Sequence, residues 1–77
     1  MAPRLSRTTG RKLVRALQQL GWEIDRIKGS HHILRHPDKP RVTLSVPVHG
    51  NRTIPIGTLT DILRDAQVDV ERFNELV

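Results

Sequence analysis

Residues 31–46, HHILRHPDKPRVTLSV, contain the pattern that decides the fold. The middle of this stretch, residues 37–40, has a proline at each end and predicts a tight turn. Residues 41–46 alternate polar and apolar side chains, which is typical of a strand with one buried and one wet face. Because residues 31–36 predict a second short strand before the turn, the stretch indicates an antiparallel hairpin.

The segments on either side of this hairpin supply the other elements. Upstream, apolar residues recur at helical spacing over residues 9–20, which predicts an amphipathic helix. In residues 22–27, Trp22 and Ile24 alternate with acidic side chains, which is typical of a half-buried strand. Downstream, the spacing predicts a helix over residues 59–66 and a short last helix after Asp69, which can cap it.

The element order is therefore α-β-β-β-α-α in a single domain, residues 1–77. Three short strands joined by tight turns predict an antiparallel meander, and only the helices can cover its apolar face. The fold class is α+β, with helices packed on one face of a three-stranded antiparallel sheet. The basic residues 1–8 precede the first helix, and we expect them to form a flexible arm.

Composition limits the compartment and the partner class. The chain has no cysteine, which suits a reducing cytosol, and its first ten residues have no apolar run typical of a signal peptide or membrane anchor. Residues 1–52 carry eleven of the thirteen Lys and Arg and three of the eight acids. We expect a cytoplasmic protein, and its basic region favours nucleic acid over an acidic protein or a membrane surface as partner. A solvated basic surface without a partner explains the composition equally well.

Three of the four histidines lie in residues 31–36. One reading is that they are half-buried, hydrogen-bonded and inert. A metal site is disfavoured because adjacent strand residues such as His31 and His32 point to opposite faces, so we expect no metal or other cofactor. A further reading is that an imidazole in a basic groove recognises a phosphate or a base. The last reading is acid-base catalysis on RNA in that groove, in which an imidazole exchanges a proton with the ribose 2′-hydroxyl or the leaving oxygen.

Cations for such a reaction lie nearby in the sequence. The four candidates for contacting RNA phosphates are Lys28, Arg35, Lys39 and Arg41. Strand parity leaves the choice of histidine open: if Leu34 packs inward, His31 points to solvent, and if Ile33 packs inward, His32 does.

The succession LGW, KGSHH, HPD, IPIGTL and ILRDA over residues 11–68 resembles the HicA-type mRNA interferase toxins, also called YcfA-like proteins. The resemblance implies a fold like a double-stranded-RNA-binding domain. It also implies ribosome-independent cleavage of mRNA that halts growth, as the toxin of a type II toxin–antitoxin system, restrained by a cognate HicB-type antitoxin. The catalytic histidine of that family directly follows the Gly-Ser pair, which selects His31, with His32 as second choice.

Two matters stay open at this point. An RNA-binding module without catalysis has the same predicted architecture, and the oligomeric state does not follow from the sequence. The family commonly has glycine where this chain has Gln67, so the second helix is expected to end differently here.

Overall fold

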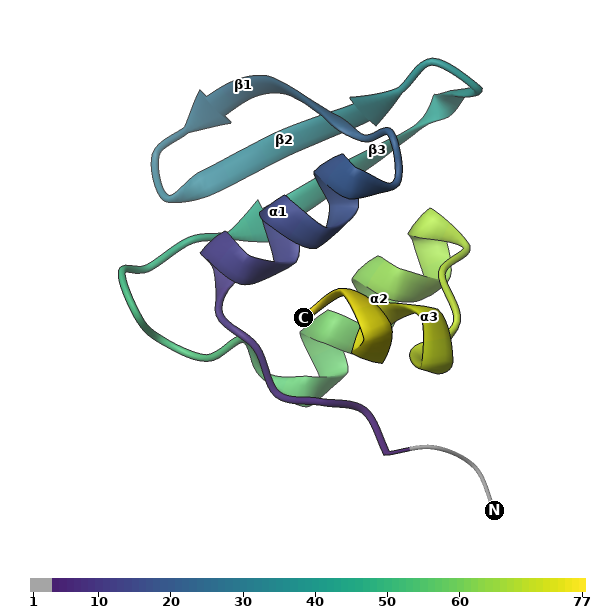
Figure 1. Cartoon of the computed structure of the whole chain (residues 1–77). Helices are drawn as coiled ribbons and strands as arrows, with labels where there is room; N and C mark the ends of the chain where they lie inside the picture. The colour runs from purple at the N-terminus through teal and green to yellow at the C-terminus, as the bar shows by residue number, and fades with distance from the viewer. Residues whose placement is uncertain (1–3) are drawn as a thin grey trace.

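The computed structural model describes residues 4–77 and shows a three-stranded antiparallel sheet with its helices on one side (Figure 1). The elements are α1 (Gly10–Gln19), β1 (Glu23–Lys28), β2 (His31–His36), β3 (Lys39–Pro47), α2 (Ile56–Ala66) and α3 (Val70–Leu76). The α+β class and the order α-β-β-β-α-α are confirmed. No helix among residues 4–77 is long and apolar enough to cross a bilayer.

The hairpin of β2 and β3 forms as its alternating pattern predicts. Leu34 lies opposite Leu44, and both side chains are buried. Thr43 and Ser45 face away from the core and are exposed. The helices therefore cover the Leu34 face, and the opposite face of the sheet is open to solvent.

Helix α1 begins against the far end of β3. The Thr9 hydroxyl accepts a hydrogen bond from the backbone N–H of Lys12 at 3.3 Å, as an N-cap does. A Cβ atom at Gly10 would collide with the carbonyl oxygen of Pro47, so only glycine allows this approach. The start of α1 is thereby fixed beside the end of β3.

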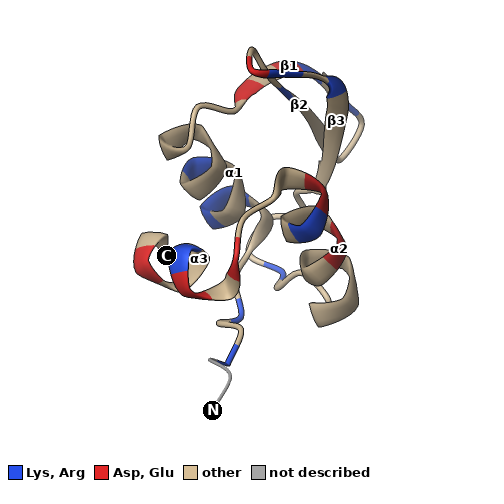
Figure 2. Cartoon of the chain, turned by 90° about the vertical axis from the view of Figure 1, so that its right-hand side faces the viewer, with Lys and Arg blue, Asp and Glu red and all other residues tan. Residues whose placement is uncertain are grey.

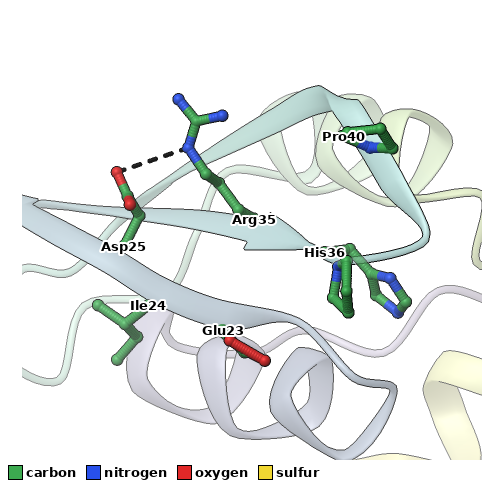
Figure 3. Close-up of a pocket in the computed structure, with 7 residues that line it drawn as sticks. Glu23, Ile24, Asp25, Arg35, His36 and Pro40 are labelled. Carbon is green, nitrogen blue, oxygen red and sulfur yellow. Dashed lines mark ion pairs between the residues drawn. The ribbon is translucent and has the colours of Figure 1, made fainter.

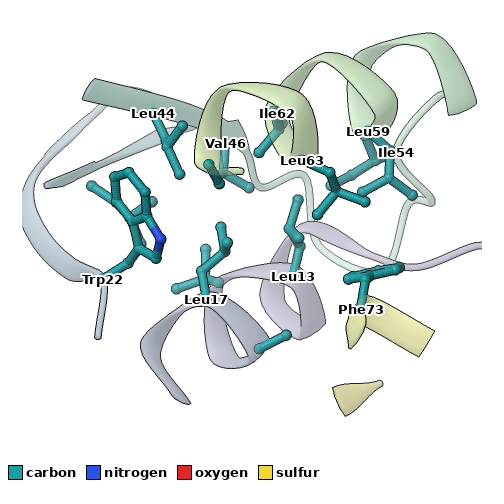
Figure 4. Close-up of a cluster of buried hydrophobic side chains, with 14 residues drawn as sticks. Leu13, Leu17, Trp22, Leu44, Val46, Ile54, Leu59, Ile62, Leu63 and Phe73 are labelled. Atoms are coloured by element: carbon teal, nitrogen blue, oxygen red, sulfur yellow. The ribbon is translucent and has the colours of Figure 1, made fainter. Parts of the chain in front are cut away.

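A single apolar core lies between the sheet and the helices (Figure 4). α1 and α2 pack on β3, and α3 contacts α1 and adds Phe73 to the core. The largest fully buried side chains are Phe73, Leu13, Leu17, Leu34, Leu44, Leu59 and Val46.

β1 differs from the half-buried strand that the sequence predicts, because all six of its residues are exposed. It is an edge strand, and the helices lie over β3 rather than over it. A register shift between Ile24 and Arg26 turns Ile24 and Ile27 toward the same side, where they remain 40% and 60% exposed. Trp22, immediately before β1, is 2% exposed and is the residue of this segment that enters the core.

Helix α2 ends at Ala66 although no glycine follows it. Gln67 adopts the left-handed conformation with φ of 59°, and its N–H bonds the carbonyl of Arg64 at 3.1 Å. The N–H of Val68 bonds the carbonyl of Leu63 at 2.9 Å, which completes the cap. The expected different ending is therefore absent, since Gln67 adopts the geometry that glycine usually provides.

Residues 4–8 are hydrogen-bonded to the rest of the domain, whereas the sequence predicts a flexible arm there. The N–H of Ser6 donates to the side-chain oxygen of Asn74 at 3.0 Å, and the Asn74 amide donates to the carbonyl of Arg4 at 2.7 Å. Thr8 is buried, and its carbonyl accepts from the N–H of Ile54 at 2.8 Å. These bonds tie the segment to α3 and to the loop before α2, while residues 1–3 of the predicted arm lie outside the described residues.

Candidate active site

The orientation of β2 separates the two adjacent histidines. Leu34 is 0% exposed, so of the two strand parities the one with Leu34 inward, which the family resemblance favours through His31, is confirmed. His32 shares its face and is half-buried, whereas His31 is exposed on the open face of the sheet.

His36 is held by hydrogen bonds at both ring nitrogens. The backbone N–H of Asp38 donates to Nδ1 at 3.1 Å, so Nδ1 accepts and Nε2 carries the proton that it donates to the carbonyl of Leu20 at 3.0 Å. The ring also meets Trp22 edge-on, with 5.2 Å between centroids. His36 thus fixes the turn between β2 and β3 against the end of α1.

His32 has a different environment from the other three histidines. Its neighbours in register are Ile27 on β1 and Val46 on β3. Its Nδ1 atom is buried and has no hydrogen-bond partner among the described residues. The His32 ring therefore lies on the helix-covered side of the sheet, and its Nδ1 atom is closed to solvent.

His31 stands where the sheet meets the loop after β3. It pairs with Lys28 on one side and Pro47 on the other. The N–H of Val48 donates to the carbonyl of Ser30 at 2.7 Å, which brings the loop back beside the β1–β2 turn. His49 follows, and its ring lies edge-on to that of His31 with 6.3 Å between centroids.

A pocket of about 450 Å³ opens between this end of the sheet, the loop of residues 48–55 and the start of α2. Its polar lining consists of His31, Ser45, His49, Arg52, Thr53 and Thr58. The N–H of Arg52 bonds the carbonyl of His49 at 3.1 Å, and Thr53 forms a β-bridge with Thr9. The loop is thus fastened at several points, and it places an imidazole and a guanidinium in the same pocket as His31.

The predicted RNA-binding cations are spread along the sheet. Lys28 lies directly beside His31. Arg35 is on the same face, where its Nε is 3.6 Å from a carboxylate oxygen of Asp25 (Figure 3). β2 rises about 3.3 Å per residue, so its ends are about 16 Å apart, and Lys39 and Arg41 lie at the end away from His31.

The sequence places His31 and Lys28 together and assigns His49 to the loop after the third strand, where it could touch RNA. It does not predict that this loop returns to His31, and it does not single out Arg52. The pattern VHGNR directly follows a strand that pairs with the one beginning at His31, and this pairing was the available signal. The sequence of a polar loop has no periodic pattern that predicts its path, so the return of this loop toward His31 could not be predicted from the sequence. Within residues 4–77, no group of three or more side chains is placed to hold a metal ion.

Comparison with known protein families gives one match. The family model described as "HicA toxin of bacterial toxin-antitoxin" matches residues 10–68, from the first residue of α1 to just beyond α2. A search among curated proteins finds no match to the chain. The matched range contains the whole pocket around His31.

Proposed function

Because this chain belongs to the HicA toxin family, the toxins of bacterial toxin–antitoxin systems, we propose that it cleaves mRNA directly, with His31 as a general acid or base. The observation that carries the proposal is the placement of His31. Its ring is exposed at a pocket lined by a second imidazole and Arg52, and Lys28 lies beside it. No hydrogen bond among the described residues engages its ring nitrogens, in contrast to those of His36.

Cleavage of RNA by its own 2′-hydroxyl needs little else. A base removes the hydroxyl proton, the 2′-oxygen bonds to phosphorus, and the bond from phosphorus to the 5′-oxygen breaks as that oxygen gains a proton. Cations stabilise the charge that develops on the phosphate oxygens. We assign this task to Lys28, which lies beside His31, and to Arg52, which lines the pocket. The reaction as written requires neither a ribosome nor a metal ion.

The open face of the sheet offers a path for the rest of the strand. Lys28, Arg35 and, by alternation along β3, Arg41 project from it. Figure 2 shows basic residues on the sheet and α1, together with acidic residues on β1. Five of the eight acids lie in residues 53–77, on and around α2 and α3. We place the flanking phosphates over this face, with Lys39 at its distal edge.

The same basic surface suits the antitoxin that the family implies. A HicB-type partner that covers His31 and Lys28 would exclude RNA from the pocket. Inhibition would then be competitive with RNA, and removal of the antitoxin would restore cleavage.

Growth and RNA integrity in a bacterial host test the proposal. We expect induction of the wild-type protein to stop growth and fragment total RNA within the same interval, and His31→Ala to do neither at equal protein level. The exposed His31 should tolerate this substitution without loss of folding, which circular dichroism checks. A wild-type protein that binds RNA and leaves it intact would instead indicate a binding module without catalysis.

A further inference from the structure

The four histidines differ in what their ring nitrogens contact. Both nitrogens of His36 are used inside the protein, and one nitrogen of His32 is buried. His31 and His49 are exposed, and the hydrogen bonds that histidine rings make among residues 4–77 are both those of His36. Within this part of the chain, His31 and His49 therefore have both ring nitrogens free of protein hydrogen bonds, and both line the same pocket.

The positions of the two rings suit one phosphodiester. Their centroids are 6.3 Å apart and they meet edge-on at 81°, so the rings do not stack. A ring nitrogen reaches an oxygen atom over about 2.6–3.2 Å, and two such contacts can span this gap through the oxygens of a single phosphate group. Arg52 lines the same pocket and supplies a positive charge.

We propose that His49 is a second catalytic residue, and that His31 and His49 divide the two proton transfers of RNA cleavage between them. One imidazole takes the proton from the 2′-hydroxyl as the 2′-oxygen bonds to phosphorus. The other, in its protonated form, gives a proton to the 5′-oxygen as its bond to phosphorus breaks. The products are a 2′,3′-cyclic phosphate and a free 5′-hydroxyl, with no net change in protons. This inference rests on the proposed function and adds the missing partner of His31.

The backbone supports a fixed position for His49. On one side of His49, the N–H of Val48 donates to the carbonyl of Ser30 at 2.7 Å. On the other side, the N–H of Arg52 donates to the carbonyl of His49 itself at 3.1 Å. Gly50 has φ of 57° within this turn, which glycine adopts without strain. A histidine on a loop free of such bonds would not keep its ring beside His31.

The test measures cleavage of a short RNA by wild type, His31→Ala and His49→Gln, with Asn51→Ala as the matched control in the same exposed turn. We expect a loss of about 100-fold or more for each histidine variant. Asn51→Ala should retain the wild-type rate, and thermal melts should show all four proteins folded. A substrate with a sulfur in place of the bridging 5′-oxygen has a leaving group that needs no proton. It should restore the variant lacking the general acid to within about tenfold of wild type, and it should leave the other variant inactive.

The outcomes separate the two proposals. Cleavage by His49→Gln at the wild-type rate, with His31→Ala inactive, would overturn the role of His49 and leave the proposed function intact. Rescue of neither variant, or equal rescue of both, by the sulfur substrate would overturn the division of the proton transfers. Wild-type protein that cannot cut RNA at all would overturn the proposed function and this inference together.

Discussion

At the scale of single residues, Trp22 is a buried aromatic side chain that joins the start of β1 to the core. It is 2% exposed, packs beside Leu17 and Leu44, and meets the ring of His36 edge-on (Figure 4). We expect Trp22→Ala to lower the free energy of unfolding by about 3 kcal/mol, since the cavity cannot be refilled. Urea unfolding measures this, with Ile27→Thr on exposed β1 as the control that should change it by less than about 0.5 kcal/mol. An unchanged midpoint for Trp22→Ala would mean that the ring is not buried.

Gln67 gives a residue-scale prediction of the opposite sign. It is the one non-glycine residue of the described chain with a positive φ, 59°, and a side chain in that conformation costs about 1 kcal/mol. We therefore expect Gln67→Gly to raise the free energy of unfolding by about 0.5 kcal/mol, because the more flexible unfolded chain offsets part of the gain. Thermal melting of the two proteins decides the sign, and a lower midpoint for Gln67→Gly would contradict this account of the α2 terminus.

At the scale of elements, the patterns that predicted correctly were the periodic ones. The alternation in β3 and the helical spacing in α1 and α2 each identify the buried face of the element. The hairpin and the helices that cover it could therefore be predicted from the sequence. The prediction that β1 is half-buried was wrong because the burial of Ile24 depends on which element packs over β1. β1 is an edge strand with a register shift, and the helices leave Ile24 uncovered. For the site, His31 followed from parity and family resemblance together, while His49 required the loop closure that only the structure shows.

The loop of residues 48–55 and the distal end of the hairpin should affect cleavage differently. Arg52 lines the His31 pocket, whereas Arg41 lies at the end of the sheet away from His31. We expect Arg52→Gln to lower kcat by about tenfold or more, because it removes charge beside the reacting phosphate. Arg41→Gln should raise KM and leave kcat near its wild-type value, because it removes uniform binding. Steady-state kinetics on a short RNA measures both, and a reversed pattern would place the reacting phosphate at the other end of the sheet.

At the scale of the whole molecule, charge and architecture point to the same surface. The helices cover one face of the sheet (Figure 1), and by register and alternation Lys28, Arg35 and Arg41 lie on the open one. Five of the eight acids lie in the last third of the chain, and on the sheet Asp25 pairs with Arg35 toward the end of β2 away from His31. Under the proposed function, this one exposed surface both attracts RNA and is the surface that the antitoxin covers.

The most direct test of the central claim is cleavage of a defined RNA by purified protein in excess chelator, wild type beside His31→Ala. We expect the wild type to cut the RNA in the absence of ribosomes and free metal ions, and to leave cyclic phosphate ends. His31→Ala, folded to the same extent, should cut at least about 100-fold more slowly. Cleavage by His31→Ala at the wild-type rate, or loss of wild-type cleavage on chelation, would contradict a histidine mechanism at this site.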